Sequence, residues 1–320
     1  MKKFLKSLLI ITVALMLVSS SAFAAFTDMP EGEDGAAIQR AVDNGLLTGF
    51  EDSTVRPNAT ITRAQMATII VRAFGATDNA DISSYTDVTP SNWYYDALSK
   101  GVAMGAFQGS NNMLNPNAEI TIQEALIVLS RVFDLPETPV AALQHLLDSN
   151  SISAWAKLDV AKIIGGGYYD NTGYLRPREP MKRVEFAKVM DKLVASYITQ
   201  SGEYNASNFP QGNVLIKVDN VTLNGITSKN SIYVGDGVKS ATIFKNCDLE
   251  RVIVRGGKAE VMSGTYTTFR AVGKGSKISL AKFPKDLIRM FEDGRTGLFY
   301  AKPGYAEIVI TPHYEIEVVQ

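Results

Sequence analysis

A threefold internal repeat constrains this 320-residue chain more than any other feature. The segments "RPNATITRAQ", "NPNAEITIQE" and "RPREPMKRVE" share a proline followed by a helix-like run. These prolines are Pro57, Pro116 and Pro177, spaced by 59 and 61 residues. A repeat of this length indicates a small supersecondary unit that buries its apolar face on its neighbours.

A second set of markers has a matching spacing. Trp93 precedes Gly105 by twelve residues, and Trp155 precedes Gly167 by the same number. The same offset before Gly49 reaches an alanine, so we expect the first unit to lack its tryptophan. Two independent markers favour a true repeat over chance similarity.

Each unit is predicted to form a helix, a loop and a second helix. The first helices are expected near residues 35–44, 93–100 and 154–163, where apolar residues recur at helical spacing and glycine-bearing turns follow. Thr62 and Thr121 fit the capping-box pattern, with Gln65 and Glu124 three residues later, whereas Lys182 in the third unit does not. The second helices are strongly apolar, so we expect them to share one three-helix core.

Two arginines stand in the first turn of these second helices, Arg63 and Arg183, with Ile122 at the matching place. A cation there is unfavourable by about 0.3–1 kcal/mol, because the helix start carries partial positive charge. A guanidinium beside exposed N–H groups makes a good site for a carboxylate. The alternative is a structural bridge to a loop acid such as Asp52 or Glu51.

Other candidate positions also allow two interpretations. Trp93 and Trp155 begin their helices, where each would stack on a sugar ring or fill space between units. Asp28 and Asp87, in "FTD" and "YTD", would cap helices or line a groove. The residues alone do not decide between these roles.

The pattern "FTD … AIQRAVDNGLLTGF … VRPNATITRAQMATIIVRAFG" resembles the S-layer homology repeat. The second and third units, "NWYYDALSKGVAMGAF…LNPNAEITIQEA" and "AWAKLDVAKIIGGGYY…LRPREPMKRVEFA", follow it less closely. The resemblance covers about residues 26–197, as units 26–76, 85–134 and 148–197. It implies an α-helical pseudo-trimer that anchors an exported protein to cell-wall polysaccharide carrying pyruvate ketals.

The resemblance also implies where the ligand binds. Grooves between adjacent units would pair an arginine of one unit with an aromatic residue and a glycine turn of the next. We expect Arg63 to act with Trp93, and Arg183 to act with the backbone of a glycine turn. The turn glycines concerned are Gly49, Gly105 and Gly167. Because Ile122 replaces the arginine in the second unit, one groove is expected to lack its carboxylate partner.

The N-terminal segment predicts export. Residues 1–24 carry three lysines, an apolar run too short for a bilayer and Ala22 and Ala24 at cleavage positions, which is typical of a signal peptide. An uncleaved anchor is the alternative. Cys247 is the single cysteine, so no intrachain disulfide forms, and its apolar context favours burial. A net charge of −1 gives no electrostatic reason to expect nucleic acid.

The last third of the chain is predicted to be β-rich, which makes the whole an α+β multidomain protein. We expect a linker at 201–212 and a β domain over 213–320. Short Val-, Ile- and Thr-rich runs separated by glycine turns indicate strands. An offset of 18 residues, aligning Ile243 with Val261, favours a short β-solenoid; a small sandwich is the alternative. A helix near 285–292 and a final strand pair would cap its end.

No motif for catalysis, metal binding or a cofactor emerges. The two histidines, His145 and His313, have no second His or Cys at metal-ligand spacing. We therefore predict a non-enzymatic, secreted protein of the cell wall or S-layer, whose β domain has a structural or interaction role, possibly toward other surface-layer proteins. Two alternatives stay open: an anchored carbohydrate-active enzyme, and binding to peptidoglycan in a diderm envelope.

Overall fold

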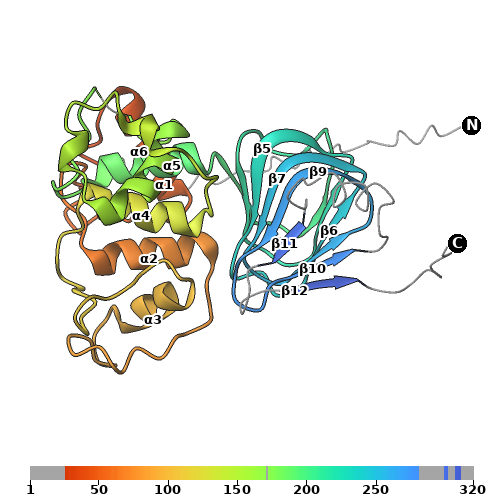
Figure 1. The fold of residues 1–320 in the computed structure, drawn as a ribbon, viewed down its shortest axis with the longest axis horizontal. Helices are drawn as coiled ribbons and strands as arrows, with labels where there is room; N and C mark the ends of the chain where they lie inside the picture. Colours follow the sequence, from red (N-terminus) through yellow and green to blue (C-terminus); the bar gives the residue numbers. More distant parts are fainter. Residues whose placement is uncertain (1–25, 171, 281–298, 302–306, 311–320) are drawn as a thin grey trace, which may run out of the picture.

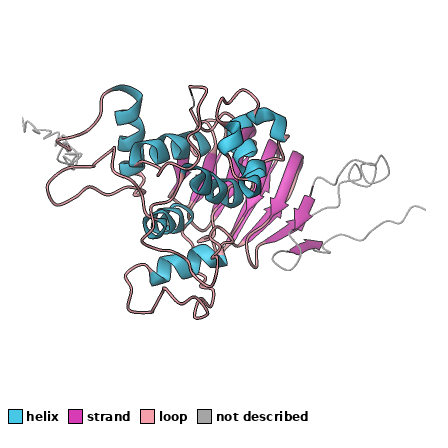
Figure 2. Cartoon of the chain, turned by 60° about the vertical axis from the view of Figure 1, so that its left-hand side comes forward, coloured by secondary structure: helices cyan, strands magenta, loops and turns pink. Residues whose placement is uncertain are grey.

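The computed structural model describes residues 26–170, 172–280, 299–301 and 307–310. It contains a helical part, on the left in Figure 1, packed against a stack of strands on the right. Figure 2 shows the strands lying side by side behind the helices. The predicted signal segment 1–24 and the predicted helix near 285–292 lie outside the described residues.

The described helices follow the predicted helix–loop–helix order. Their bounds are α1 Gly32–Asp43, α2 Arg63–Phe74, α3 Tyr95–Ala103, α4 Ile122–Val132, α5 Lys157–Gly165 and α6 Arg183–Leu193. Three short 3-10 turns lie at Val140–Leu143, Ser149–Ser151 and Ala154–Ala156. None of the helices in this part of the chain has the length and apolar character that a membrane crossing requires.

The three units close on one another around a ring of backbone hydrogen bonds. The N–H of Ile61 donates to Met181 O at 3.0 Å, that of Met181 to Ile120 O at 2.9 Å, and that of Ile120 to Ile61 O at 2.9 Å. Each loop before a second helix therefore joins the other two. This ring confirms the expected pseudo-trimer, and α2, α4 and α6 contribute to its buried core.

The starts of the second helices match their capping patterns. Thr62 accepts from the N–H of Gln65 at 3.2 Å, while the Gln65 amide accepts from the N–H of Thr62 at 2.9 Å. At Lys182, which has no side-chain acceptor, the Glu185 carboxylate still accepts the backbone N–H at 2.9 Å. The third helix start thus keeps half of the capping box.

The strands form two six-stranded sheets in which every described pair is parallel. One sheet has the order β1-β3-β5-β7-β9-β11 and the other β12-β10-β8-β6-β4-β2. Their bounds are β1 Ser196–Ile198, β2 Gly202–Tyr204, β3 Val214–Ile216, β4 Val221–Asn224, β5 Thr227–Val234, β6 Ala241–Lys245, β7 Cys247–Val254, β8 Lys258–Val261, β9 Gly264–Ala271, β10 Lys277–Leu280, β11 Phe299–Ala301 and β12 Glu307–Ile310. Strands that alternate between two parallel sheets along the chain are the coils of a β-solenoid, which confirms that prediction over the sandwich.

The predicted period is correct in size but one residue off where it was aligned. Phe244, not Ile243, lies opposite Val261. Coil lengths differ because the turns differ: β7 and β9 pair at an offset of 17 residues, while β5 and β7 are shifted further by an irregularity between Ser228 and Ser231. A fixed period therefore cannot align every coil.

The predicted linker at 201–212 is part of the first coil. β2 lies inside this segment and pairs with β4, while β1, which precedes it, pairs with β3. Phe209 packs against the solenoid core. The polar and glycine-rich composition of the segment therefore reflects the turn of a coil, and the solenoid begins directly after α6.

The two parts share one apolar core. Leu215, Tyr233 and Ile253 of the solenoid are buried together with the helical residues. Phe133 packs edge-to-face against Phe74 and against Tyr233, each with ring centroids 5.1 Å apart. Buried aromatic contacts of this kind hold the helical part and the solenoid in a defined arrangement.

Cys247 is buried inside the solenoid, as the sequence predicts. Its Sγ lies 3.4 Å from Leu223 O, and burial raises the pKa of the thiol. Because the thiolate is the reactive form, the raised pKa makes this cysteine unreactive.

Candidate functional site

Asp28 and Asp87 fix the loops that lead to the second helices. The Asp87 carboxylate accepts the N–H groups of Leu114 at 2.9 Å and Asn115 at 2.7 Å, and Asp28 makes the equivalent pair of bonds in the first unit. In all three units, the first bonded N–H lies 27 residues after the aspartate. Both oxygens of each carboxylate are thus occupied, so the predicted helix-capping role is wrong.

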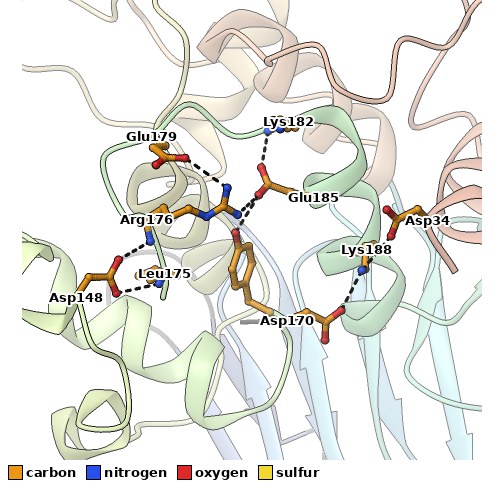
Figure 3. A network of polar contacts seen from close by, with 10 residues as sticks. Asp34, Asp148, Asp170, Leu175, Arg176, Glu179, Lys182, Glu185 and Lys188 are labelled. Atoms are coloured by element: carbon orange, nitrogen blue, oxygen red, sulfur yellow. Dashed lines mark hydrogen bonds and ion pairs between the residues drawn. The ribbon is translucent and has the colours of Figure 1, made fainter. Parts of the chain in front are cut away.

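Asp148 plays the same part in the third unit and was missed from the sequence. It accepts the N–H groups of Leu175 at 2.9 Å and Arg176 at 2.7 Å, as Figure 3 shows. Its constant spacing from the following proline is the signal that identifies it.

The residue before each repeat proline is left-handed, not extended as the sequence suggests. Arg56, Asn115 and Arg176 have φ values of 48°, 52° and 57°. Each of these N–H groups is held by the aspartate of its own unit. The carboxylate therefore stabilises a backbone conformation that non-glycine residues rarely adopt.

We expect Asp87→Ala to lower the free energy of unfolding by about 1–3 kcal/mol, because it leaves two N–H groups unpaired beside a left-handed residue. Urea unfolding of the two proteins measures the difference. Asp81→Ala is a matched control, because Asp81 is exposed and bonds locally to Ser83. Equal effects of the two substitutions would contradict this role of Asp87.

Arg63 and Arg183 bind backbone carbonyls of a neighbouring unit. Arg63 Nε donates to Leu114 O at 2.8 Å and Nη2 to Gln108 O at 3.2 Å. Arg183 makes the equivalent bonds to the first unit, to Val55 O at 2.8 Å and to Thr48 O at 2.7 Å. The proposed bridge to Asp52 is wrong, because Arg56 pairs with that carboxylate.

The two arginines differ in exposure. Arg183 is 9% exposed, whereas Arg63 is only partly buried. Burial lowers the pKa of both guanidinium groups, which still remain charged at neutral pH. Within the described residues neither arginine has a salt bridge, so each carries a positive charge that no contacting carboxylate compensates.

The helix starts beside these arginines are not free to bind an anion. The N–H groups of Arg63 and Ala64 donate to Ala118 O and Pro116 O, both at 2.9 Å. The N–H groups at the starts of α4 and α6 donate to the next unit in the same way. The backbone half of the predicted anion site is therefore already used, and only the arginine side chains remain for it.

An open groove of about 670 Å³ runs past Arg63. The turn at Phe107–Ser110 and one side of α4 line it, the latter with Glu124 and Arg131, and Trp155 of the third unit completes it. Arg131 lies 3.9 Å from Asp159, a long ion-pair distance. The groove thus combines two cations, one exposed indole and nearby acceptors.

The predicted pairing of Arg63 with Trp93 is not what the structure shows. Trp155 lines the groove of Arg63, and Trp93 is not among the residues that line it. Trp93 is 67% exposed and packs edge-to-face on Tyr94, while Trp155 is 60% exposed. Neither tryptophan fills the core, so that alternative is wrong.

The turn glycines have two different roles. Gly105 and Gly167 have φ values of 71° and 73°, and their counterpart in the first unit is Gly45 at 69°. Gly49 instead lies against Phe26, where an added Cβ would come within 2.0 Å of the ring. The predicted register of the first unit is therefore wrong by four residues, and Glu33 takes the place of the tryptophan.

At the place of the missing arginine, a polar network occupies the corresponding junction. Arg176 pairs with Glu185 at 2.6 Å, and Tyr169 donates to the same carboxylate at 3.3 Å (Figure 3). Lys188 bridges Asp34 at 3.0 Å and Asp170 at 3.4 Å. Burial is the main cause of the raised pKa of Tyr169. This junction, beside Ile122, lacks the open arginine-lined arrangement of the Arg63 groove.

The described residues hold no other obvious chemical centre. No group of three or more His, Cys, Asp or Glu side chains in this part of the chain is placed to bind a metal ion.

The S-layer homology domain model matches residues 25–67 and 84–126. The chain is an S-layer homology domain protein. The match covers the first two units, and the third has the same aspartate clamp and the same place in the ring. The domain and its surface-layer relatives locate this S-layer homology protein at the cell wall or in the surface layer.

Relatives of this S-layer homology protein are much longer than the matched part. The surface-layer 125 kDa protein of Lysinibacillus sphaericus is 29% identical over 74% of this chain and 19% of its own length. The surface layer protein of Brevibacillus choshinensis is 27% identical over 51% of this chain and 15% of its own. An amylopullulanase of Thermoanaerobacterium thermosulfurigenes is 26% identical over 53% and 9%. The similarity thus spans less than a fifth of each relative.

Proposed function

We propose that the helical part anchors this chain non-covalently to an anionic cell-wall polysaccharide, with a carboxylate-bearing sugar in the groove of Arg63 and Trp155. The single observation that carries the proposal is the position of Arg63. Its guanidinium lines an open groove and has no salt-bridge partner among the described residues. A carboxylate would supply the missing charge through the remaining N–H groups of the fork.

The rest of the groove suits a sugar. Trp155 presents an apolar face to the CH groups of a pyranose ring, and Glu119 and Glu124 provide acceptors for hydroxyl groups. The Glu124 carboxylate is already fixed by the N–H and hydroxyl of Thr121, at 2.9 and 2.7 Å. Such prearranged acceptors favour a neutral hydroxyl beside them, while the charged group of the ligand lies toward Arg63 and Arg131.

A pyruvate ketal fits this arrangement, because it places one carboxylate directly on a sugar ring. The ketal is our choice from the resemblance to other S-layer homology repeats, and the groove supports it through its cations. The solenoid, joined firmly to the helices, would then have a structural or interaction role at the cell surface, and the anchored protein would not be an enzyme.

Trp155→Ala is expected to weaken binding to purified cell walls by about tenfold, because stacking on an aromatic ring contributes roughly 1–3 kcal/mol in carbohydrate-like apolar contacts of this size. Its exposed position means that the thermal unfolding of the protein stays unchanged. Co-sedimentation with walls measures binding. Arg63→Gln should produce a similar loss with some loss of stability.

The matched control is Trp93→Ala, which removes an equally exposed indole outside the Arg63 groove. Walls stripped of ketal pyruvate provide the second comparison. Unchanged binding to stripped walls would exclude the pyruvate carboxylate and favour peptidoglycan as the ligand. If Trp155→Ala and Arg63→Gln both bind native walls like the parent protein, this groove is not the anchoring site.

A further inference from the structure

A second cavity, of about 340 Å³, lies where the helical part meets the solenoid. Its helical side includes Asp78 and Met104, and its solenoid side is formed by the corners of successive coils. It is distinct from the Arg63 groove, because the two cavities have no lining residue in common. Nothing in the anchoring role proposed above uses it.

The cavity is strongly cationic although the whole chain has a net charge of only −1. Its lining contains the five cations Lys239, Arg255, Lys258, Lys274 and Lys277, against the two acids Asp78 and Asp236. Lys239 pairs with Asp78 at 3.1 Å, and Arg255 pairs with Asp236 at 2.7 Å. These pairs account for both acids, so the lining keeps an excess of three positive charges.

The solenoid stacks these cations at one corner. Lys258 starts β8 and lies in register with Lys277 at the start of β10. Adjacent strands lie about 4.8 Å apart, so like charges in register repel each other. Glu260 reaches Lys258 at 2.8 Å, and Glu307 of β12 is the register partner of Lys277 on its other side. Lys274, in the turn before β10, is exposed and adds a further cation.

Glycines let the backbone form the floor of this cavity. An added Cβ at Gly256 would come within 2.3 Å of Gly235 O, and Gly275 has a φ of 73°. Among the described contacts, the N–H groups of Gly256, Gly257 and Gly275 donate to no protein acceptor. Backbone N–H groups at such turns, surrounded by lysines, form a setting that favours an anion.

We propose that this cavity is a second binding site, for an oxyanion carried by a cell-wall polymer, either a phosphate or a carboxylate. The bound group would lie between Lys239, Lys258 and Lys274 and would contact both parts of the protein. Because it binds only when helices and solenoid are docked, it stabilises the docked state. The chain would then hold the wall at two places instead of one.

Thermal unfolding of the full chain in inorganic phosphate, glucuronate or chloride at equal ionic strength tests this site. Phosphate or glucuronate should raise Tm above chloride, and the more effective ion identifies the source as phosphate or carboxylate groups. The double variant Lys239→Gln/Lys274→Gln should weaken phosphate or glucuronate binding by about tenfold or more, since two charge-assisted contacts are lost.

The matched control is Lys229→Gln/Lys245→Gln, which removes the same charge from solenoid positions outside the cavity lining. Arg63→Gln should keep the anion response, which separates this site from the anchoring groove. Three results would each overturn the proposal: no rise of Tm in the parent protein, an unchanged response in the Lys239/Lys274 variant, or an equal loss in the control.

Discussion

Arg255→Met is expected to lower the free energy of unfolding by about 3–5 kcal/mol, because it leaves a buried carboxylate without its partner. Arg255 is 3% exposed and lies at the centre of the junction between helices and solenoid. Its guanidinium pairs with Asp236 at 2.7 Å and donates to Val132 O at 3.0 Å and Met104 O at 2.9 Å. One side chain thus links two helical units to the solenoid.

The same substitution should also change how stability depends on pH. Burial raises the pKa of Asp236, and Arg255 partly opposes that rise. A carboxyl group with a raised pKa in the folded state stays protonated after the unfolded chain has ionised, so stability falls as pH increases through this window. Without Arg255 the pKa rises further. The loss of stability should therefore be larger at pH 7 than at about pH 4.5, near the ordinary range of carboxyl groups.

Urea unfolding at both pH values measures these effects. Arg178→Met is the control, because Arg178 is exposed and makes one hydrogen bond, to Ser151 O at 3.2 Å. The double variant Arg255→Met/Asp236→Asn should recover part of the loss, since it removes the unpaired charge. A loss under 1 kcal/mol in the single variant, or one that does not depend on pH, would contradict the view of Arg255 as the link between the parts.

The sequence predicts what depends on local chemistry. Thr62 and Gln65 identify a capping box, and the proline spacing identifies three units, because both signals lie within a few residues of the structure they form. The β-rich period likewise indicates a solenoid. Its exact register could not be predicted, because each corner turn has its own length and shifts the strands that follow it.

The errors concern contacts between distant segments. Arg63 and Trp93 belong to consecutive units, but the ring brings Trp155 of the third unit to the Arg63 groove. Chain order does not say which surface of a neighbour faces a groove. Arg255 carried no signal at all, since its partners Met104 and Val132 contribute only backbone carbonyls. The same holds for Arg63 and Arg183, whose carbonyl acceptors no side-chain pattern reveals.

These carbonyl contacts predict unequal effects of removing the two arginines. Arg183→Met should lower the free energy of unfolding by about 2–5 kcal/mol, because it leaves Thr48 O and Val55 O unpaired at a buried place, each at roughly 1–3 kcal/mol. Arg63→Met should have a smaller effect, because Arg63 lies along an open groove where water can reach Leu114 O and Gln108 O. Urea unfolding of both variants measures the difference.

Wall binding of the same two variants gives the opposite order. Arg63→Met removes the cation that lines the groove, so it should weaken binding even where the protein is fully folded. Arg183→Met should retain binding at temperatures below its unfolding transition, because the Arg183 guanidinium is almost completely buried and both of its bonded nitrogens serve the junction of the first and third units. Equal stability losses together with equal binding losses would show that both arginines have one role, and the assignment of ligand binding to Arg63 would be wrong.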